Sequence, residues 1–112
     1  MNQFISSAPT LAWNILGPIP SFKNEKFKIF DDGDVYKGQM TATGIKSGFG
    51  TIIHKSKGVI YMGSWKNDWK EGRGVYVNFN GVRMRGMTVK NHIEGEALVE
   101  YPDGWKYLRT FK

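Results

Sequence analysis

The sequence predicts an all-β fold: a single-layer, twisted antiparallel meander of β-hairpin repeats with an extended N-terminal arm. Three observations predict it. A pattern of glycine and aromatic residues recurs at a spacing of 23 residues, segments of strand length alternate with Gly, Asn and Asp turn signals, and helical periodicity is hard to find in the repeats. We therefore place the arm at residues 1–26 and the repeat domain at residues 27–112.

The repeat divides the domain into units. A Tyr-x-Gly-x-Trp segment is followed by Gly-x-Gly and then by a turn glycine, and the earliest unit holds two extra residues. The units lie at about 33–57, 58–80 and 81–103, with a partial unit at 104–112. In such an array each unit packs mainly against its neighbours, so the architecture follows from the period.

Each unit contains two segments of strand length. Asn80–Gly81 and Asp103–Gly104 predict hairpin turns, because these pairs adopt positive φ at little cost. Asn67–Asp68 and Asn91–His92 mark looser turns. The expected strands lie near 27–30, 34–41, 49–54, 59–66, 73–79, 82–89, 96–101 and 104–111.

Alternate residues of a strand share a face, so Tyr61, Gly63 and Trp65 lie together. Gly74 and Tyr76 share a face in the same way. A glycine opposite an aromatic residue leaves room for the ring to lie flat on the neighbouring backbone. We therefore interpret the repeating residues as structural: Tyr36, Gly38, Gly48, Gly50, Tyr61, Gly63, Trp65, Gly72, Gly74, Gly86, Gly95, Tyr101, Gly104 and Tyr107.

The units resemble the MORN repeat family. The resemblance rests on Tyr-x-Gly-x-Trp at 61–65, Gly-x-Gly at 72–74 and Tyr-Pro-Asp-Gly at 101–104, and it covers about residues 30–112. The later units depart from the pattern, as expected where a solenoid ends. Two aromatics are replaced by Met84 and Thr88, and two glycines are replaced by Ala97 and Arg109.

This resemblance implies a protein-interaction or scaffold module, a small structural subunit of a larger intracellular assembly. A cytoskeletal or ciliary setting follows from the family alone. The alternative that the family implies is a peripheral membrane module that binds acidic phospholipids. The net charge of +6 permits weak phospholipid contact, but the basic residues form no dense block, and nucleic acid is the least favoured partner.

Cysteine is absent, which agrees with a reducing, intracellular compartment. A cytoplasmic or cytoskeletal location is expected, and a mitochondrial assembly stays open. The chain has 112 residues, which suits one domain of limited core, so part of its stability is expected to come from partner subunits.

The sequence predicts no catalytic residue, no metal site and no cofactor. His54 and His92 fall at non-equivalent positions of different units, away from a recognisable nucleophile or base. The acidic cluster of Asp31, Asp32 and Asp34 lacks the length and distal Glu of a calcium loop, so we interpret it as turn residues. The chain is therefore expected not to be an enzyme.

Candidate partner contacts come from the arm and the surface of the sheet. Trp69 stands where the repeat expects a polar turn, so it either caps the solenoid or anchors a partner. The arm is apolar and rich in proline, and it either packs on the sheet or docks into a neighbouring subunit, which we favour. The remaining candidates are Trp13, Leu16 and Phe22 in the arm and Val77, Phe79, Arg83 and Arg85 on one sheet face.

Overall fold

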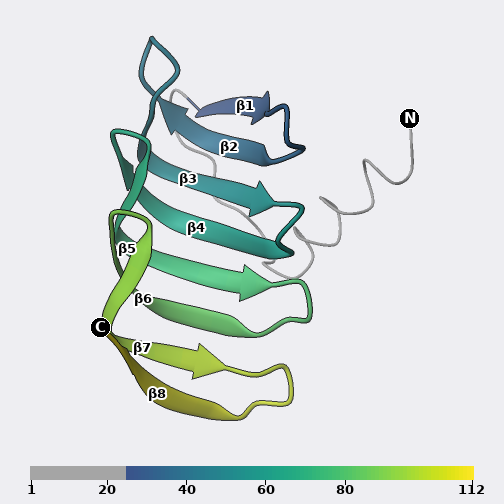
Figure 1. The fold of residues 1–112 in the computed structure, drawn as a ribbon, viewed down its shortest axis with the longest axis vertical. Helices are drawn as coiled ribbons and strands as arrows, with labels where there is room; N and C mark the ends of the chain where they lie inside the picture. The colour runs from purple at the N-terminus through teal and green to yellow at the C-terminus, as the bar shows by residue number, and fades with distance from the viewer. Residues whose placement is uncertain (1–24) are drawn as a thin grey trace.

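The computed structural model describes residues 25–112, which form one open antiparallel sheet whose strand order follows the chain (Figure 1). The predicted all-β, single-layer meander of hairpins is confirmed. The predictions for residues 1–24 of the arm lie outside the described residues, whereas residues 25 and 26, which were assigned to the arm, begin the first strand of the sheet. The eight strands are β1 (Glu25–Ile29), β2 (Val35–Met40), β3 (Lys46–His54), β4 (Val59–Lys66), β5 (Trp69–Asn78), β6 (Arg83–Val89), β7 (His92–Glu100) and β8 (Lys106–Phe111).

Strands β3, β5 and β7 begin three or four residues earlier than the sequence predicts, so the hairpins that they form are longer than expected. The connection between β4 and β5 is a two-residue turn, with φ of 50° at Asn67 and 67° at Asp68. The connection between β6 and β7 is also a two-residue turn, with φ of 45° at Lys90 and 74° at Asn91. Positive φ at both central residues is the geometry that suits a tight hairpin. The prediction of looser turns was therefore wrong, and the second turn lies one residue earlier than expected.

At the opposite ends of the strands, the predicted glycine turns are confirmed. Gly81 and Gly104 have φ of 93° and 98°, where residues with a Cβ are strained. The Gly81 amide donates to the Asn78 carbonyl at 2.8 Å, and the Gly104 amide donates to the Tyr101 carbonyl at 3.0 Å. These bonds close the β5–β6 and β7–β8 connections.

Strand pairing places Gly38, Gly50, Gly63, Gly74 and Gly86 in one row across β2 to β6. We call this the glycine row. Two tyrosine rings lie over it, so a Cβ added at Gly50 or Gly74 would overlap a ring. The rings of Tyr36 and Tyr61 thus occupy the space that a side chain at Gly50 or Gly74 would need.

Each of these tyrosine side chains lies along its own strand, and its hydroxyl bonds the carbonyl three residues later. The Tyr36 hydroxyl donates to the Gln39 carbonyl at 2.7 Å, and the Tyr61 hydroxyl donates to the Ser64 carbonyl at 2.8 Å. The pairing register shifts between Gly63 and Trp65, and equivalent shifts occur in β2 and β6. Such bulges bend a strand and increase its local twist.

The two faces of the sheet bury different side chains. The tyrosine face carries the glycine row and a cluster of Tyr36, Ile52, Tyr61 and Trp65. Trp65 lies edge-on between two tyrosines, with ring centroids 5.5 Å from Tyr36 and 5.3 Å from Tyr61. The valine face carries the other buried cluster: Val35, Ile53, Ile60 and Val77. Residues 25–112 include no helix, and so none that could cross a membrane.

Candidate functional site

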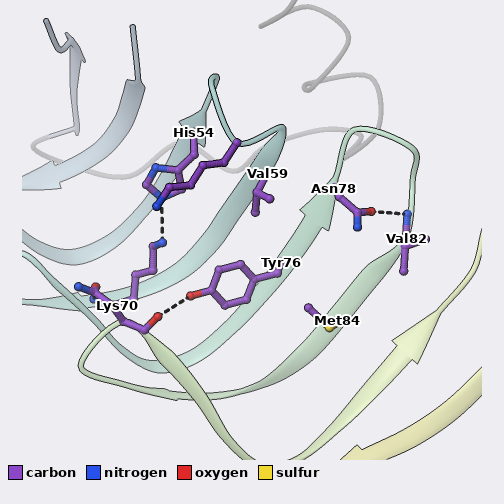
Figure 2. Close-up of a pocket in the computed structure, with 9 residues that line it drawn as sticks. His54, Val59, Lys70, Tyr76, Asn78, Val82 and Met84 are labelled. Carbon is purple, nitrogen blue, oxygen red and sulfur yellow. Dashed lines mark hydrogen bonds between the residues drawn. The ribbon is translucent and has the colours of Figure 1, made fainter. Parts of the chain in front are cut away.

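A chain of three polar side chains crosses the tyrosine face. The Nδ1 atom of His54 lies 2.8 Å from Oδ2 of Asp34, and its Nε2 atom lies 2.8 Å from Nζ of Lys70. An ammonium group can only donate, so Nε2 accepts and Nδ1 carries the proton that is donated to Asp34. Figure 2 shows Lys70 reaching His54 at the wall of a pocket.

The strands position these three residues from distant parts of the sequence. Asp34 directly precedes β2 and His54 ends β3, so they continue the pairing of Val35 with Ile53. The second Asp34 oxygen accepts the Lys55 amide at 3.2 Å. Lys70 lies near the start of β5. The tight turn before this strand lets pairing begin at Trp69, so Lys70 pairs with Trp65 on the tyrosine face.

Lys70 is only 9% exposed, and its ammonium lies 5.4 Å from the Tyr61 ring centroid and 5.1 Å from that of Tyr76. Burial lowers the pKa of Lys70 to about 8, and the positive charge of Lys57 adds to this effect. Burial also lowers the pKa of His54 below its ordinary value, and the bond to Asp34 opposes that change. Near neutral pH, Lys70 is therefore mostly protonated and presents positive charge, and His54 is mostly neutral.

The pocket beside Lys70 has a volume of about 310 Å³. Its apolar wall is formed by Val59, Val82 and Met84, and the Tyr76 ring lies between this wall and Lys70. The Tyr76 hydroxyl donates to the Asn91 carbonyl at 3.0 Å, which fixes the ring, and burial raises the pKa of that hydroxyl to about 12. The polar residues on the pocket wall are His54, Lys57, Lys70, Asn78 and Asn91.

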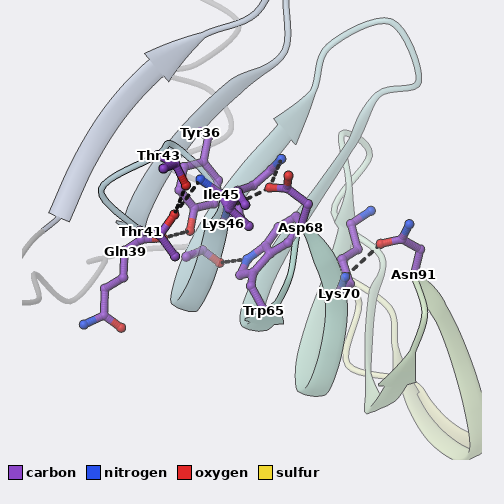
Figure 3. Close-up of polar contacts among 11 residues, drawn as sticks. Tyr36, Gln39, Thr41, Thr43, Ile45, Lys46, Trp65, Asp68, Lys70 and Asn91 are labelled. Atoms are coloured by element: carbon purple, nitrogen blue, oxygen red, sulfur yellow. Dashed lines mark hydrogen bonds and ion pairs between the residues drawn. The ribbon is translucent and has the colours of Figure 1, made fainter.

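The preceding unit of the sheet contains an equivalent lysine, Lys46, with different neighbouring side chains. Lys46 lies over the rings of Phe30, Tyr36 and Trp65, at 5.0, 5.8 and 5.3 Å from their centroids. Its backbone amide donates to Oδ1 of Asp68 at 2.7 Å, and its ammonium lies 3.3 Å from the same atom. Figure 3 shows both lysines, each beside the turn of the following hairpin.

At Lys70 the same turn contact is made by an amide. The Lys70 backbone amide donates to Oδ1 of Asn91 at 2.8 Å, so Asn91 holds the place that Asp68 holds one hairpin earlier. The two lysines are therefore matched in backbone contact and aromatic packing. They differ in the charge of the neighbouring turn residue.

No protein-family model and no curated protein sequence matches this chain. Within residues 25–112, no three His, Cys, Asp or Glu side chains come together in a group that could hold a metal ion.

The structure places the predicted contact residues in unequal surroundings. Trp69 is the first residue of β5 and not a turn residue, and it is 45% exposed. Val77 has no exposed surface and belongs to the buried cluster of the valine face, against which Phe79 packs, so Val77 offers no partner contact in this conformation. Arg83 lies beside Val77 on the neighbouring strand.

Arg85 is exposed on β6, and its Nε atom lies 2.8 Å from a Glu100 oxygen. Lys106 approaches the other Glu100 oxygen at 3.7 Å. These contacts offset part of the positive charge of this face. Trp13, Leu16 and Phe22 lie outside the described residues.

Sequence reasoning missed the chain of Asp34, His54 and Lys70. Asp32 does behave as the predicted turn residue, because its carboxylate accepts the Asp34 amide at 2.9 Å. Asp34, in contrast, is buried and bonded to His54. The available signal was a departure from the repeat, since Val59 occupies the position of Asp34 one unit later and Asn78 that of His54.

Proposed function

We propose that this chain is a non-catalytic protein-interaction module, a MORN-like structural subunit of a larger intracellular assembly. The observation that carries the proposal is the apolar surface of the last hairpin. Trp105 is 75% exposed and Leu108 is 64% exposed. The Tyr101 and Tyr107 rings of the same hairpin stack with their centroids 6.0 Å apart. Exposed apolar groups of this size are typical of contact surfaces, because water covers them at a cost in free energy.

Strand β8 adds a second feature that favours a protein partner. It is the outermost strand of the described sheet, so one side of its backbone is available to pair with an added strand. Leu108 pairs with Leu98 in the row of the valine face, whereas Tyr107 pairs with Val99 in the row of the tyrosine face. A partner that adds a strand here would cover apolar groups on both faces and pair the free edge.

The resemblance to MORN proteins adds a cytoskeletal or ciliary setting to this proposal. No second function is proposed, because no particular surface of residues 25–112 favours phospholipid over protein.

The test is affinity purification of the full chain from its native source, with partners identified by mass spectrometry. We expect a Trp105→Ser, Leu108→Ser double variant to lose partners that the unchanged chain retains. A matched control places serine at Phe27 and Ile29, which are 61% and 60% exposed on β1 at the other edge of the sheet.

Both variants should melt close to the unchanged protein by circular dichroism, since exposed substitutions usually change stability by less than about 0.5 kcal/mol. Identical partner sets for all three proteins would contradict a contact at β8.

A further inference from the structure

Lys70 is a largely buried cation for which residues 25–112 provide no ion pair. Its equivalent, Lys46, has Asp68 at 3.3 Å. The ammonium of Lys70 has three donors, and one of them is directed at His54. The ammonium also lies over the rings of Tyr61 and Tyr76, and Lys70 is part of the pocket wall.

The charges around the pocket favour a ligand with one negative charge. Lys57 and Lys70 are cations on the pocket wall, and no carboxylate is among the described residues that line it. Asp34 lies behind His54 and offsets one of the two positive charges. The remaining single positive charge matches a carboxylate better than a doubly charged phosphate.

The rest of the pocket favours an apolar body on that ligand. Val59, Val82 and Met84 form one wall, and the volume of about 310 Å³ is at the lower end of the range for small-molecule sites. A chain of a few carbon atoms could lie on this wall while its carboxylate reaches Lys70.

We propose that this pocket binds an organic carboxylate, with its anionic group on Lys70 and its apolar part on Val59, Val82 and Met84. The fold already holds a carboxylate against the equivalent lysine, because Asp68 does so at Lys46. At Lys70 the ligand supplies the charge that Asn91 lacks. This inference is independent of the proposed partner contact at β8.

The test uses sodium hexanoate as the probe and the full chain labelled for NMR. We expect a saturable change in the His54 and Lys70 side-chain signals, with a dissociation constant on the order of 1 mM. Hexanol, which has the same apolar tail and no charge, should cause no saturable change. The same result for hexanol and hexanoate, or no saturation by hexanoate, would overturn the proposal.

Two reciprocal substitutions isolate the counterion. Asn91→Asp should place a carboxylate beside Lys70 and weaken hexanoate binding by about tenfold or more, because a charge-assisted bond then competes with the ligand. Asp68→Asn makes the same chemical exchange at Lys46 and should leave binding unchanged. Both turns should stay intact, because each variant residue already occupies the other turn at positive φ.

Unchanged binding by Asn91→Asp would contradict the role of Lys70. Lys70→Met should remove binding altogether, and its circular dichroism spectrum checks that the sheet remains folded. Because Asn91→Asp retains every side chain on the pocket wall except the amide, the proposal stays testable even if Lys70→Met does not fold.

Two further probes identify the source of the carboxylate. A capped Ala-Glu-Leu tripeptide that binds more tightly than hexanoate would assign the ligand to an acidic side chain of a partner. Weaker binding by the tripeptide would assign it to a free small molecule. Saturable binding of inorganic phosphate without binding of hexanoate would overturn the assignment of a carboxylate.

Discussion

The hairpins formed by β2–β5 and the strands β6–β8 follow the same repeat, yet they bury very different amounts of side chain. Most of the buried apolar residues lie between Val35 and Val77, whereas β6–β8 contribute Ala97 and Val99 to this set. No residue of β8 is buried. The two regions share the sheet pairing, so pairing by itself does not account for the difference.

The difference follows from which residues meet across the glycine row. In β4 and β5, the ring of Tyr61 lies against Gly74. One unit later Met84 and Ala97 hold these two positions, so no aromatic ring lies flat on the backbone there. Gly86 faces the Ala97 methyl group instead, and a Cβ added at Gly86 would lie 3.1 Å from it.

A hydrogen bond from this position to the preceding strand survives the loss, although its acceptor lies two residues earlier in the repeat. Trp65 donates from Nε1 to the Gly50 carbonyl at 3.0 Å, and Thr88 donates from its hydroxyl to the Gly72 carbonyl at 2.7 Å. The last unit therefore keeps a hydrogen bond to the preceding strand while it loses a large apolar group. Hydrogen bonding maintains the register at the end of the array, and aromatic packing supplies burial in its centre.

The largest effect should come from Gly74→Ala. The added methyl group overlaps the Tyr61 ring, which is fully buried and cannot move outward without losing its packing. We expect the free energy of unfolding to fall by about 3 kcal/mol, at the upper end of ordinary overpacking. Urea denaturation measures it, and a loss below about 1 kcal/mol would contradict the packing of Tyr61 on the row.

The pH dependence of stability should arise from the central hairpins. The pKa of Lys70 is about 8 in the folded chain and near 10.4 in an unfolded one, so the unfolded state binds more protons between these values. Stability should therefore rise by about 2 kcal/mol from pH 8 to pH 10. Above pH 10 it should fall, because burial raises the pKa of Tyr61 and Tyr76 and the unfolded state then loses protons first.

Urea denaturation at pH 8, 9 and 10 measures this change, with Lys70→Met as the control. The variant should show little rise over that range. A rise of equal size in the variant would assign the pH dependence to other groups.

The smallest effect should come from Gly86→Ala, the same substitution in the same row. The new methyl group would lie 3.1 Å from the Ala97 methyl group, so that neighbour has to shift by only a few tenths of an ångström. Alanine also restricts the unfolded chain more than glycine does. We expect a change within about 1 kcal/mol in either direction. Equal losses for Gly86→Ala and Gly74→Ala would show that the two regions pack alike, which would break the comparison.

The sequence by itself determined the elements that follow from a repeating pattern of residue types. The alternation of residues along a strand and the spacing of 23 residues predict every strand, the two faces, the glycine turns and the glycines beneath Tyr36 and Tyr61. These features are repeated, so each unit supports the assignment of the next. The tight turns at Asn67–Asp68 and Lys90–Asn91 were missed because their type depends on φ at both central residues.

Only the tertiary structure decided where the non-repeating polar residues meet. Asp34 directly precedes β2, His54 ends β3 and Lys70 lies in β5. Their contacts depend on the bulge in β4 and on the early start of β5. A periodic pattern can place the strands that carry or adjoin Asp34 and Lys70. Contacts between side chains of different strands do not recur along the sequence, so no pattern predicts them. The chain of contacts is therefore a property of the folded sheet.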